Sequence, residues 1–379
     1  MAIKPYARPD VRESDIDALC DVLRSQFLTT GPKVPELEER FLALVQSQEA
    51  VACSNGTTAL HLASLAIGLK PGDKVIVPAL TFLATANAVR MCGADVVFCD
   101  VDPETGIMRL DDLKGAEKSA GGPIKAVFPV HIGGHCADMK AISDYARKKS
   151  WLIVEDACHA LGGTNHGHPV GACGYSDLAC FSLHATKSFT ACEGGVVTTN
   201  NPDYAERMRT LRNHGMQRDP QAGPWAYEMN ELGYNYRLTD VQAALGICQI
   251  DRMKEVEIRR GEIVAQYRTA LDGVSDCLTS VPPTGNGDPL LHLFQVLIEY
   301  DQLGKSRAQV MKELMDRGVG TQVHYIPVAN QPYYVGLYGK SDVKGADRFY
   351  ERVLALPLYS SLTDEDVAEV IRAVKEVVA

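Results

Sequence analysis

The feature that most constrains the fold is an alternation of short apolar runs with helix-like segments through the first two thirds of the chain. The apolar runs have the length of strands and lie at 74–78, 95–100, 125–130, 151–156, 178–182 and 194–199. Helical patterns lie between several of them, at 58–69, 138–149 and 202–213. Strands that are apolar on both faces and alternate with helices are typical of a mainly parallel sheet covered on both sides. We therefore expect an α/β fold.

The pattern changes beyond residue 250 or so. A long charged, amphipathic helix is predicted over 251–271, and it is followed by a loop at 281–289 and a strand at 293–300. A helix at 306–317, a strand at 320–328 and two terminal helices then follow, and "TDED" has the capping-box pattern at the start of the last helix. We expect a large α/β domain over 1–250 and a smaller α+β domain over 251–379.

Composition excludes several classes of protein. The chain has 379 residues, 46% of them hydrophobic, which is enough for a sizeable core. Its net charge is −10 and no block of Lys and Arg stands out, so no nucleic-acid partner is expected. No apolar stretch approaches the length of a membrane span, and the polar N-terminal segment does not resemble a signal peptide. The eleven cysteines are scattered without a CxxC pair, which favours reduced thiols in a cytoplasmic protein and predicts no metal site.

Ligands of such sheets bind beyond the carboxyl ends of the strands, so the residues that follow the apolar runs are the candidates for a site. The segment "SNGTTALHLA" brings an Asn-Gly turn and two threonines to the start of a helix. The N–H groups of a helix N-terminus, together with hydroxyls, bind anions such as phosphate, although the same residues also serve as a simple helix cap. Phe82 follows the run 74–78 and is either a core aromatic or a cover for a flat ligand.

Asp156 lies at the carboxyl end of the apolar run "WLIV". A carboxylate there needs a partner, because its desolvation alone is costly. A metal ion, an arginine and a protonated ring nitrogen are the partners to consider, and a carboxylate that caps the next turn is the structural alternative. His159 follows three residues later, close enough to share the same site.

Lys187 lies in "FSLHATKSFTACEGG", a run of small, hydroxyl-bearing and aromatic residues. Desolvation lowers the pKa of a lysine in such surroundings and frees its amine to act as a nucleophile. Lysine amines form Schiff bases with carbonyls, including pyridoxal 5'-phosphate. That cofactor also needs an acid for its ring nitrogen, an aromatic face for its ring and hydroxyls for its phosphate, and the chain offers all of these.

The order and wording of these segments resemble the sugar aminotransferases named after DegT, DnrJ, EryC1 and StrS. The resemblance covers nearly the whole chain, through "LTTGPKVPELEERF", "NGTTALHLA", "PALTFLATANAV", "VEDACHALGG", "FSLHATKSFTACEGG", "NHGM", "GYNYRLTDVQAALG", "VHYIPV" and "LPLYSSLTDEDV". It implies the fold of the pyridoxal-phosphate-dependent transferases of fold type I, which is that of aspartate aminotransferase. A large domain with a mainly parallel sheet and a smaller C-terminal α+β domain are part of that fold.

The resemblance also implies roles for the matching residues. Lys187 would bind the cofactor and then move protons, Asp156 would pair with the ring nitrogen, and Phe82 would stack on the ring. The phosphate would be held by Thr57, Thr58 and Ser182. His159 stands where many members carry Gln, and it would donate to the phenolic oxygen of the cofactor. Asn235 would reach the cofactor phosphate of the neighbouring subunit, which implies a homodimer with shared active sites.

Within the family, "KPYARPDV", "EDACHALGG", "NHGM" and "GTQVHYIPVANQPYY" resemble the transaminase of pseudaminic acid biosynthesis. This resemblance implies transfer of an amino group from L-glutamate to C4 of a UDP-4-keto-6-deoxy-N-acetylhexosamine, which gives UDP-4-amino-4,6-dideoxy-N-acetyl-β-L-altrosamine. The implied sugar-nucleotide site is lined by Tyr6, Leu28, Thr29, Thr30, Gly31, Val323, His324, Tyr325 and Ile326.

Two alternatives remain open at this point. A GDP-perosamine-type or C3 sugar aminotransferase shares much of the same wording, and sequence spacing does not orient a sugar. A protein that binds the cofactor or a nucleotide sugar without turnover is the other, because fold does not fix function. The joint presence of Lys187, Asp156 and Phe82 favours an enzyme.

Overall fold

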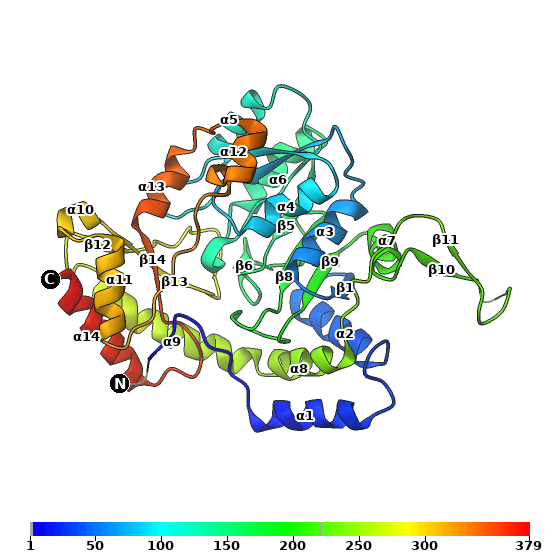
Figure 1. Cartoon of the computed structure of the whole chain (residues 1–379), viewed down its shortest axis with the longest axis horizontal. Helices are drawn as coiled ribbons and strands as arrows, with labels where there is room; N and C mark the ends of the chain where they lie inside the picture. The colour runs from blue at the N-terminus through cyan, green and yellow to red at the C-terminus, as the bar shows by residue number, and fades with distance from the viewer. Residues whose placement is uncertain (1–2, 220) are drawn as a thin grey trace.

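A sheet of seven strands forms the centre of the protein in this computed structural model, which describes residues 3–219 and 221–379 (Figure 1). All neighbours in the sheet are parallel except β9, which runs antiparallel to both strands beside it. In spatial order the strands are β1 (Glu49–Cys53), β9 (Gly195–Thr199), β8 (Leu178–Ser182), β5 (Leu152–Asp156), β4 (Ala126–Val127), β2 (Lys74–Pro78) and β3 (Asp95–Cys99).

Helices cover both faces of this sheet, because successive strand residues point to opposite sides and both sides are apolar. Val75 and Val77 of β2 pack in one core cluster while Ile76 between them packs in another. On the first face lie α3 (Gly56–Ala66), α4 (Leu83–Met91) and α7 (Pro202–Arg212). On the second face lie α2 (Lys33–Val45), α5 (Leu110–Ser119), α6 (Met139–Lys148) and α8 (Asp240–Asp251).

The strands and helices expected in this part of the chain are confirmed to within a few residues at their ends. The exception in length is 125–130, where only Ala126 and Val127 belong to the sheet as β4. Pro129 has no N–H to donate to a neighbouring strand, and the chain turns into the short 3-10 helix η1 (Ile132–Gly134). This early exit brings the His131–Gly134 turn to the carboxyl edge of the sheet.

A second, antiparallel sheet lies in the C-terminal third, with its own core of aliphatic and aromatic side chains. Its strands are β12 (Leu278–Ser280), β13 (Phe294–Ile298) and β14 (Val353–Leu356), in that spatial order. The helices of this part are α9 (Met253–Leu271), α10 (Tyr300–Leu303), α11 (Arg307–Asp316), the 3-10 helix η2 (Val328–Asn330), α12 (Pro332–Tyr338), α13 (Lys344–Arg352) and α14 (Asp364–Val378). The predicted capping box is confirmed, since Thr363 accepts from the N–H of Asp366 at the start of α14.

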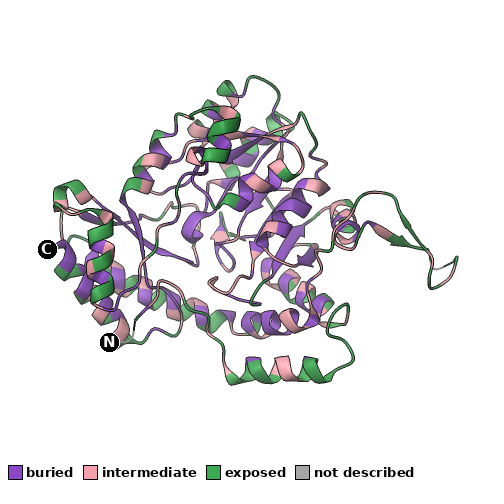
Figure 2. Ribbon diagram, in the orientation of Figure 1, coloured by how far each residue is buried: buried purple, intermediate pink, exposed green. Residues whose placement is uncertain are grey.

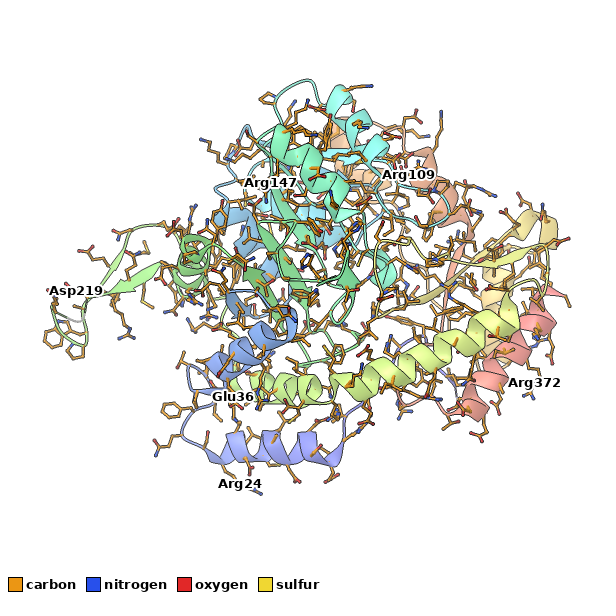
Figure 3. The ribbon with its side chains drawn as sticks, turned by 180° about the vertical axis from the view of Figure 1, so that it is seen from behind. Arg24, Glu36, Arg109, Arg147, Asp219 and Arg372 are labelled. Carbon is orange, nitrogen blue, oxygen red and sulfur yellow. The ribbon has the colours of Figure 1, made fainter. Side chains whose placement is uncertain are left out.

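The strand predicted over 320–328 is wrong. This segment makes an isolated bridge from Gln322 to Ala355 of β14, and β14 rather than 320–328 forms the third strand of the sheet. Residues 322–325 instead line a cleft, and Pro327 cannot donate to a ladder. The division of the chain at residue 250 stays a prediction, since only Arg252 separates α8 from α9 and the two helices follow one another along one side of the molecule (Figure 3).

Two elements stand at the periphery. Helix α1 (Glu13–Arg24) packs along α8, where the buried Asp15 carboxylate is held by Arg252 through contacts of 2.5 and 2.9 Å. The hairpin of β10 (Met216–Arg218) and β11 (Tyr227–Met229) projects from the body and is largely exposed (Figure 2). A smaller hairpin pairs β6 (Thr164–Asn165) with β7 (His168–Pro169). Within the described parts of the chain, no helix has the length and apolarity that crossing a membrane requires.

Candidate active site

A cleft of about 810 Å³ opens at the carboxyl edge of the parallel strands. The segments that follow β1, β2, β5 and β8 meet there, because parallel strands end at the same edge of a sheet. Residues 322–325 of the C-terminal third and Tyr6 close the other side. The predicted site residues that line this cleft are Tyr6, Thr57, Thr58, Phe82, Asp156, His159, Ser182, Lys187, Val323, His324 and Tyr325.

Lys187 reaches the cleft from the loop that follows β8. Burial lowers the pKa of its amine from the ordinary value of 10.5, and the nearby Asp156 carboxylate opposes this shift only in part. Its side chain forms no ion pair with any carboxylate in the part of the chain that the structure describes. A neutral amine therefore forms more readily here than on a surface lysine, and a neutral amine is the nucleophilic form.

Asp156 is the last residue of β5 and is 5% exposed. Its Oδ2 accepts from the hydroxyl of Thr85 at 2.6 Å, and its Oδ1 accepts from the N–H of Cys158 at 3.2 Å. Both donors are neutral, and neither an arginine ion pair nor a metal-binding cluster is found at this carboxylate among the described residues. A protonated ring nitrogen from a ligand would supply the missing cation.

The start of α3 forms a cradle for an anion. Asn55 caps the helix by accepting from the N–H of Thr58, and the Thr58 hydroxyl donates back to the Asn55 carbonyl at 2.8 Å. The Thr58 hydroxyl is therefore engaged in the cap, whereas Thr57 lines the cleft. A Cβ on Gly56 would lie 2.8 Å from Cβ and 3.1 Å from Oγ of Ser182, so the glycine allows the first turn of α3 to pack directly beside this hydroxyl.

Phe82 is the N-cap residue of α4 and is 53% exposed. It is therefore not a core aromatic, which was one of the two roles that the sequence allowed. Its ring lies 5.6 Å from that of Tyr325, with a tilt of 52°. Tyr325 comes from a segment more than two hundred residues away. The two aromatic faces thus border the same part of the cleft, where a flat ring can be covered.

His159 is 8% exposed and held in one tautomer. Its Nδ1 accepts from the backbone N–H of Gly133 at 3.1 Å, so the proton of the neutral ring lies on Nε2. Nε2 is 3.3 Å from the hydroxyl of Tyr325. Burial and the nearby Lys187 hold the pKa of His159 well below its usual value of 6.5, so the ring is a neutral hydrogen-bond donor toward the cleft.

Some predicted site residues lie elsewhere. Asn235 is exposed and bridges to Asn213 rather than lining the cleft. Thr29 bridges to Thr239, and Asp240 accepts from the N–H of Gly31, which places this loop against the start of α8. The predicted residues outside the cleft lining of their own chain are Leu28, Thr29, Thr30, Gly31, Asn235 and Ile326.

Other site residues were not anticipated from the sequence. Thr85 lies one helical turn beyond Phe82 and orients Asp156, and its place in "TFLATANAV" was the only signal for it. Gly133 sets the tautomer of His159 from a loop that carried no signal. Thr186, Glu193 and Gln322 also line the cleft.

These features match the requirements of pyridoxal 5'-phosphate. A desolvated lysine, a buried carboxylate without a cation and the N-terminus of α3 with the hydroxyls of Thr57 and Ser182 are brought together in one cleft. The fold and site define a pyridoxal-phosphate-dependent transferase of fold type I. The model of the DegT/DnrJ/EryC1/StrS aminotransferase family matches residues 9–375, and the chain belongs to this family.

Relatives with assigned names are similar over their whole length. The spore coat polysaccharide biosynthesis protein SpsC of Bacillus subtilis is 37% identical over 382 residues, which cover 99% of this chain and 97% of SpsC. The UDP-4-amino-4-deoxy-L-arabinose–oxoglutarate aminotransferase of Shewanella sediminis is 34% identical over 385 residues, with 99% and 98% covered.

Solved structures agree with this assignment. The Streptococcus pneumoniae protein Spr1654 in its PMP form superposes with a TM-score of 0.91 at 32% identity, and the match covers 99% of this chain and 98% of Spr1654. The Helicobacter pylori aminotransferase PseC, involved in the biosynthesis of pseudaminic acid, superposes with a TM-score of 0.93 at 26% identity and covers 99% of both chains. The protein is thus a pyridoxal-phosphate-dependent sugar aminotransferase.

Proposed function

We propose that the protein transfers an amino group from L-glutamate to C4 of a UDP-4-keto-6-deoxy-N-acetylhexosamine. The product is UDP-4-amino-4,6-dideoxy-N-acetyl-β-L-altrosamine, a precursor of pseudaminic acid. The observation that carries the proposal is the meeting of Lys187, Asp156, Phe82 and the α3 cradle in one cleft. The similarity to the Shewanella enzyme supports a UDP-linked 4-amino sugar as the product, and the similarity to PseC supports the pathway of pseudaminic acid.

The residues of the chain divide the work of this reaction. Lys187 would bind the cofactor through its amine nitrogen, remove the proton from Cα of glutamate and later deliver a proton to C4 of the sugar. Asp156, oriented by Thr85, would keep the ring nitrogen protonated. When bound, pyridoxal phosphate accepts the electron pair that proton removal leaves on carbon. Phe82 would cover the ring, and Nε2–H of His159 would donate to its phenolic oxygen.

The phosphate of the cofactor would lie in the α3 cradle. Thr57 and Ser182 are the hydroxyls available to it, together with the N–H groups of the first turn. The Thr58 hydroxyl is engaged in the Asn55 cap, so we propose that Thr58 holds the cap rather than the phosphate. This division differs from the one that the family resemblance implies.

The sugar would enter between Tyr6 and residues 322–325. The Tyr6 ring lies 5.2 Å from that of His324, and His324 is 5% exposed. Burial lowers the pKa of His324 to about 4, so this ring is neutral at physiological pH and offers hydrogen bonds rather than charge. A neutral, aromatic entrance is suited to the apolar face of a 6-deoxy sugar.

We also propose a homodimer with shared active sites. Asn235 bridges to Asn213, the 28–31 loop is anchored at the start of α8, and both lie outside the cleft of their own chain. The family resemblance assigns Asn235 and the 28–31 loop to the active site, so their position outside the cleft is consistent with an active site that a second copy of the chain completes. Cross-complementation tests this: mixing Lys187→Ala chains with Asn235→Ala chains should restore activity in mixed dimers, and no recovery would contradict shared sites.

The first test is the absorption spectrum of the purified protein before and after addition of L-glutamate. Loss of the yellow band, with formation of 2-oxoglutarate, is expected for the native chain and not for Lys187→Ala. The aminated protein is then given the UDP-4-keto-6-deoxy sugar, and the product is analysed by NMR to place the new nitrogen. Amination at C3, or acceptance of only GDP-linked sugars, would favour the perosamine-type or C3 alternative, and a spectrum indifferent to glutamate would contradict the donor.

A further inference from the structure

A small pocket of about 10 Å³ adjoins the active-site cleft beside Lys187. Leu161 and Phe189 supply its apolar walls, and its polar lining comes from Cys158, His159, Ser182, Lys187, Ser188 and His292. This volume is about what one water molecule requires, and a buried water also needs two to four polar partners. The pocket meets both conditions.

His292 is the member of this lining that comes from outside the α/β sheet. It lies just before β13 and is 4% exposed, and its Nδ1 has no hydrogen-bond partner among the described residues. Its backbone is fixed on both sides, because its N–H donates to the Gly133 carbonyl and its carbonyl accepts from the buried Arg260 at 2.8 Å. The backbone of His292 is thus fixed, while Nδ1 of its imidazole has no hydrogen-bond partner among the described residues.

Two other groups in the lining, His159 and Cys158, are already engaged. His159 uses Nδ1 to accept from Gly133 and carries its proton on Nε2, so it has no free acceptor for a donor in the pocket. Cys158 donates its thiol hydrogen to the Cys180 carbonyl. His292 lies against His159, with ring centroids 4.6 Å apart, and burial keeps the pKa of His292 well below 6.5. A neutral His292 has one ring nitrogen free to accept.

We propose that His292 is a positioning residue for Lys187, and that it acts through one water molecule bound in the pocket between them. The water accepts from the Lys187 ammonium and donates to the unprotonated nitrogen of His292. This gives the amine a fixed resting place when it is not bonded to the cofactor. The inference rests on the proposed role of Lys187 and adds His292 to the residues that hold its amine in position.

The titration of Lys187 in the full-length chain freed of cofactor tests the proposal. Competitive acetylation with acetic anhydride across a pH series, read by mass spectrometry, gives the midpoint at which the amine reacts. The groups that face Lys187 are Asp156, Cys158, His159 and His324, with Arg260 behind His292, and all are unchanged in the variants.

His292→Leu removes the acceptor for the water and should lower the midpoint by about one pH unit, because the ammonium loses a hydrogen bond that favours it. His292→Gln can still accept from the water and should restore a midpoint near the native one. His135→Leu is the matched control, since His135 is also buried with an unpartnered Nδ1 but lies outside both pockets. It should leave the midpoint unchanged.

An unchanged midpoint in His292→Leu would overturn the proposal, and so would an equal shift in His292→Gln. A high-resolution crystal structure of the native protein provides a measurement that needs no variant: a water within hydrogen-bond distance of Nζ of Lys187 and of the His292 ring supports the proposal, and its absence refutes it. Neither measurement involves glutamate or a sugar. If the protein fails to react with glutamate but His292→Leu still shifts the Lys187 midpoint, the proposed function is contradicted and the role of His292 is not.

Discussion

Thr85 donates its hydroxyl hydrogen to Oδ2 of Asp156 across 2.6 Å. Both side chains are buried, and Oγ1 of Thr81 lies 2.7 Å from Oγ1 of Thr85. The Thr85 hydroxyl has one hydrogen, so Thr81 is the donor to Thr85 in this chain of hydroxyls. The relay fixes the direction in which the carboxylate presents its remaining lone pairs, and it links the loop after β2 to the end of β5.

Thr85→Val should therefore weaken cofactor binding about tenfold, because it removes a hydrogen bond to a charged group while keeping the volume of the side chain. The dissociation constant of pyridoxal phosphate, measured by fluorescence quenching on the cofactor-free chain, checks this. Thr85→Ser keeps the hydroxyl and should bind the cofactor nearly as tightly as the native chain. Equal affinity in Thr85→Val and in the native chain would show that Asp156 does not meet the ring.

Gly56→Ala should reduce cofactor affinity by at least about tenfold, because the added methyl group would lie 2.8 Å from Cβ of Ser182 and force apart the two sides of the proposed phosphate cradle. The backbone of Gly56 is helical, so alanine causes no strain in the helix itself. The matched control is Gly115→Ala in α5, where the new methyl group meets no atom within 4 Å. That variant should bind the cofactor normally and gain about 1 kcal/mol of stability. Normal affinity in Gly56→Ala would move the phosphate elsewhere.

Stability should fall as the pH is lowered from 6.5 toward 4. Burial lowers the pKa of His135 in the folded state to about 4, against an ordinary value of 6.5. The unfolded chain therefore binds more protons between these two values, and the contribution of His135 is complete above pH 6.5 and lost as the pH falls toward 4. The whole window corresponds to about 3 kcal/mol for this residue. Urea unfolding of native and His135→Leu chains across the window should show a shallower pH dependence in the variant.

Asp15→Ala should cost about 3 kcal/mol or more, because it leaves the Arg252 guanidinium without its carboxylate partner at the α1–α8 contact. Chemical denaturation provides the measurement. Lys140→Ala breaks an exposed pair with Asp144 and should change the free energy of unfolding by less than about 0.5 kcal/mol. Comparable losses in the two variants would mean that the buried pair does not anchor α1.

Some residues of the candidate site could be predicted from the sequence and others could not, for physical reasons. Lys187, Asp156 and Phe82 each follow an apolar run, and a buried parallel strand is visible in sequence as such a run. Their convergence then follows from the parallel direction of the strands. Thr85, Gly133 and His292 act through hydrogen bonds and contacts between segments far apart in the chain, and no local pattern reports such contacts.

The sequence by itself determined the α/β class and six of the seven strands of the large sheet, and it supplied the candidate site residues, because hydrophobic periodicity and family motifs are local properties. Tertiary structure alone decided that β14 rather than 320–328 completes the second sheet, and that Asn235 lies outside the cleft of its own chain. Each of these depends on which distant partner satisfies a backbone or side-chain hydrogen bond. That choice is made by the packing of the whole chain.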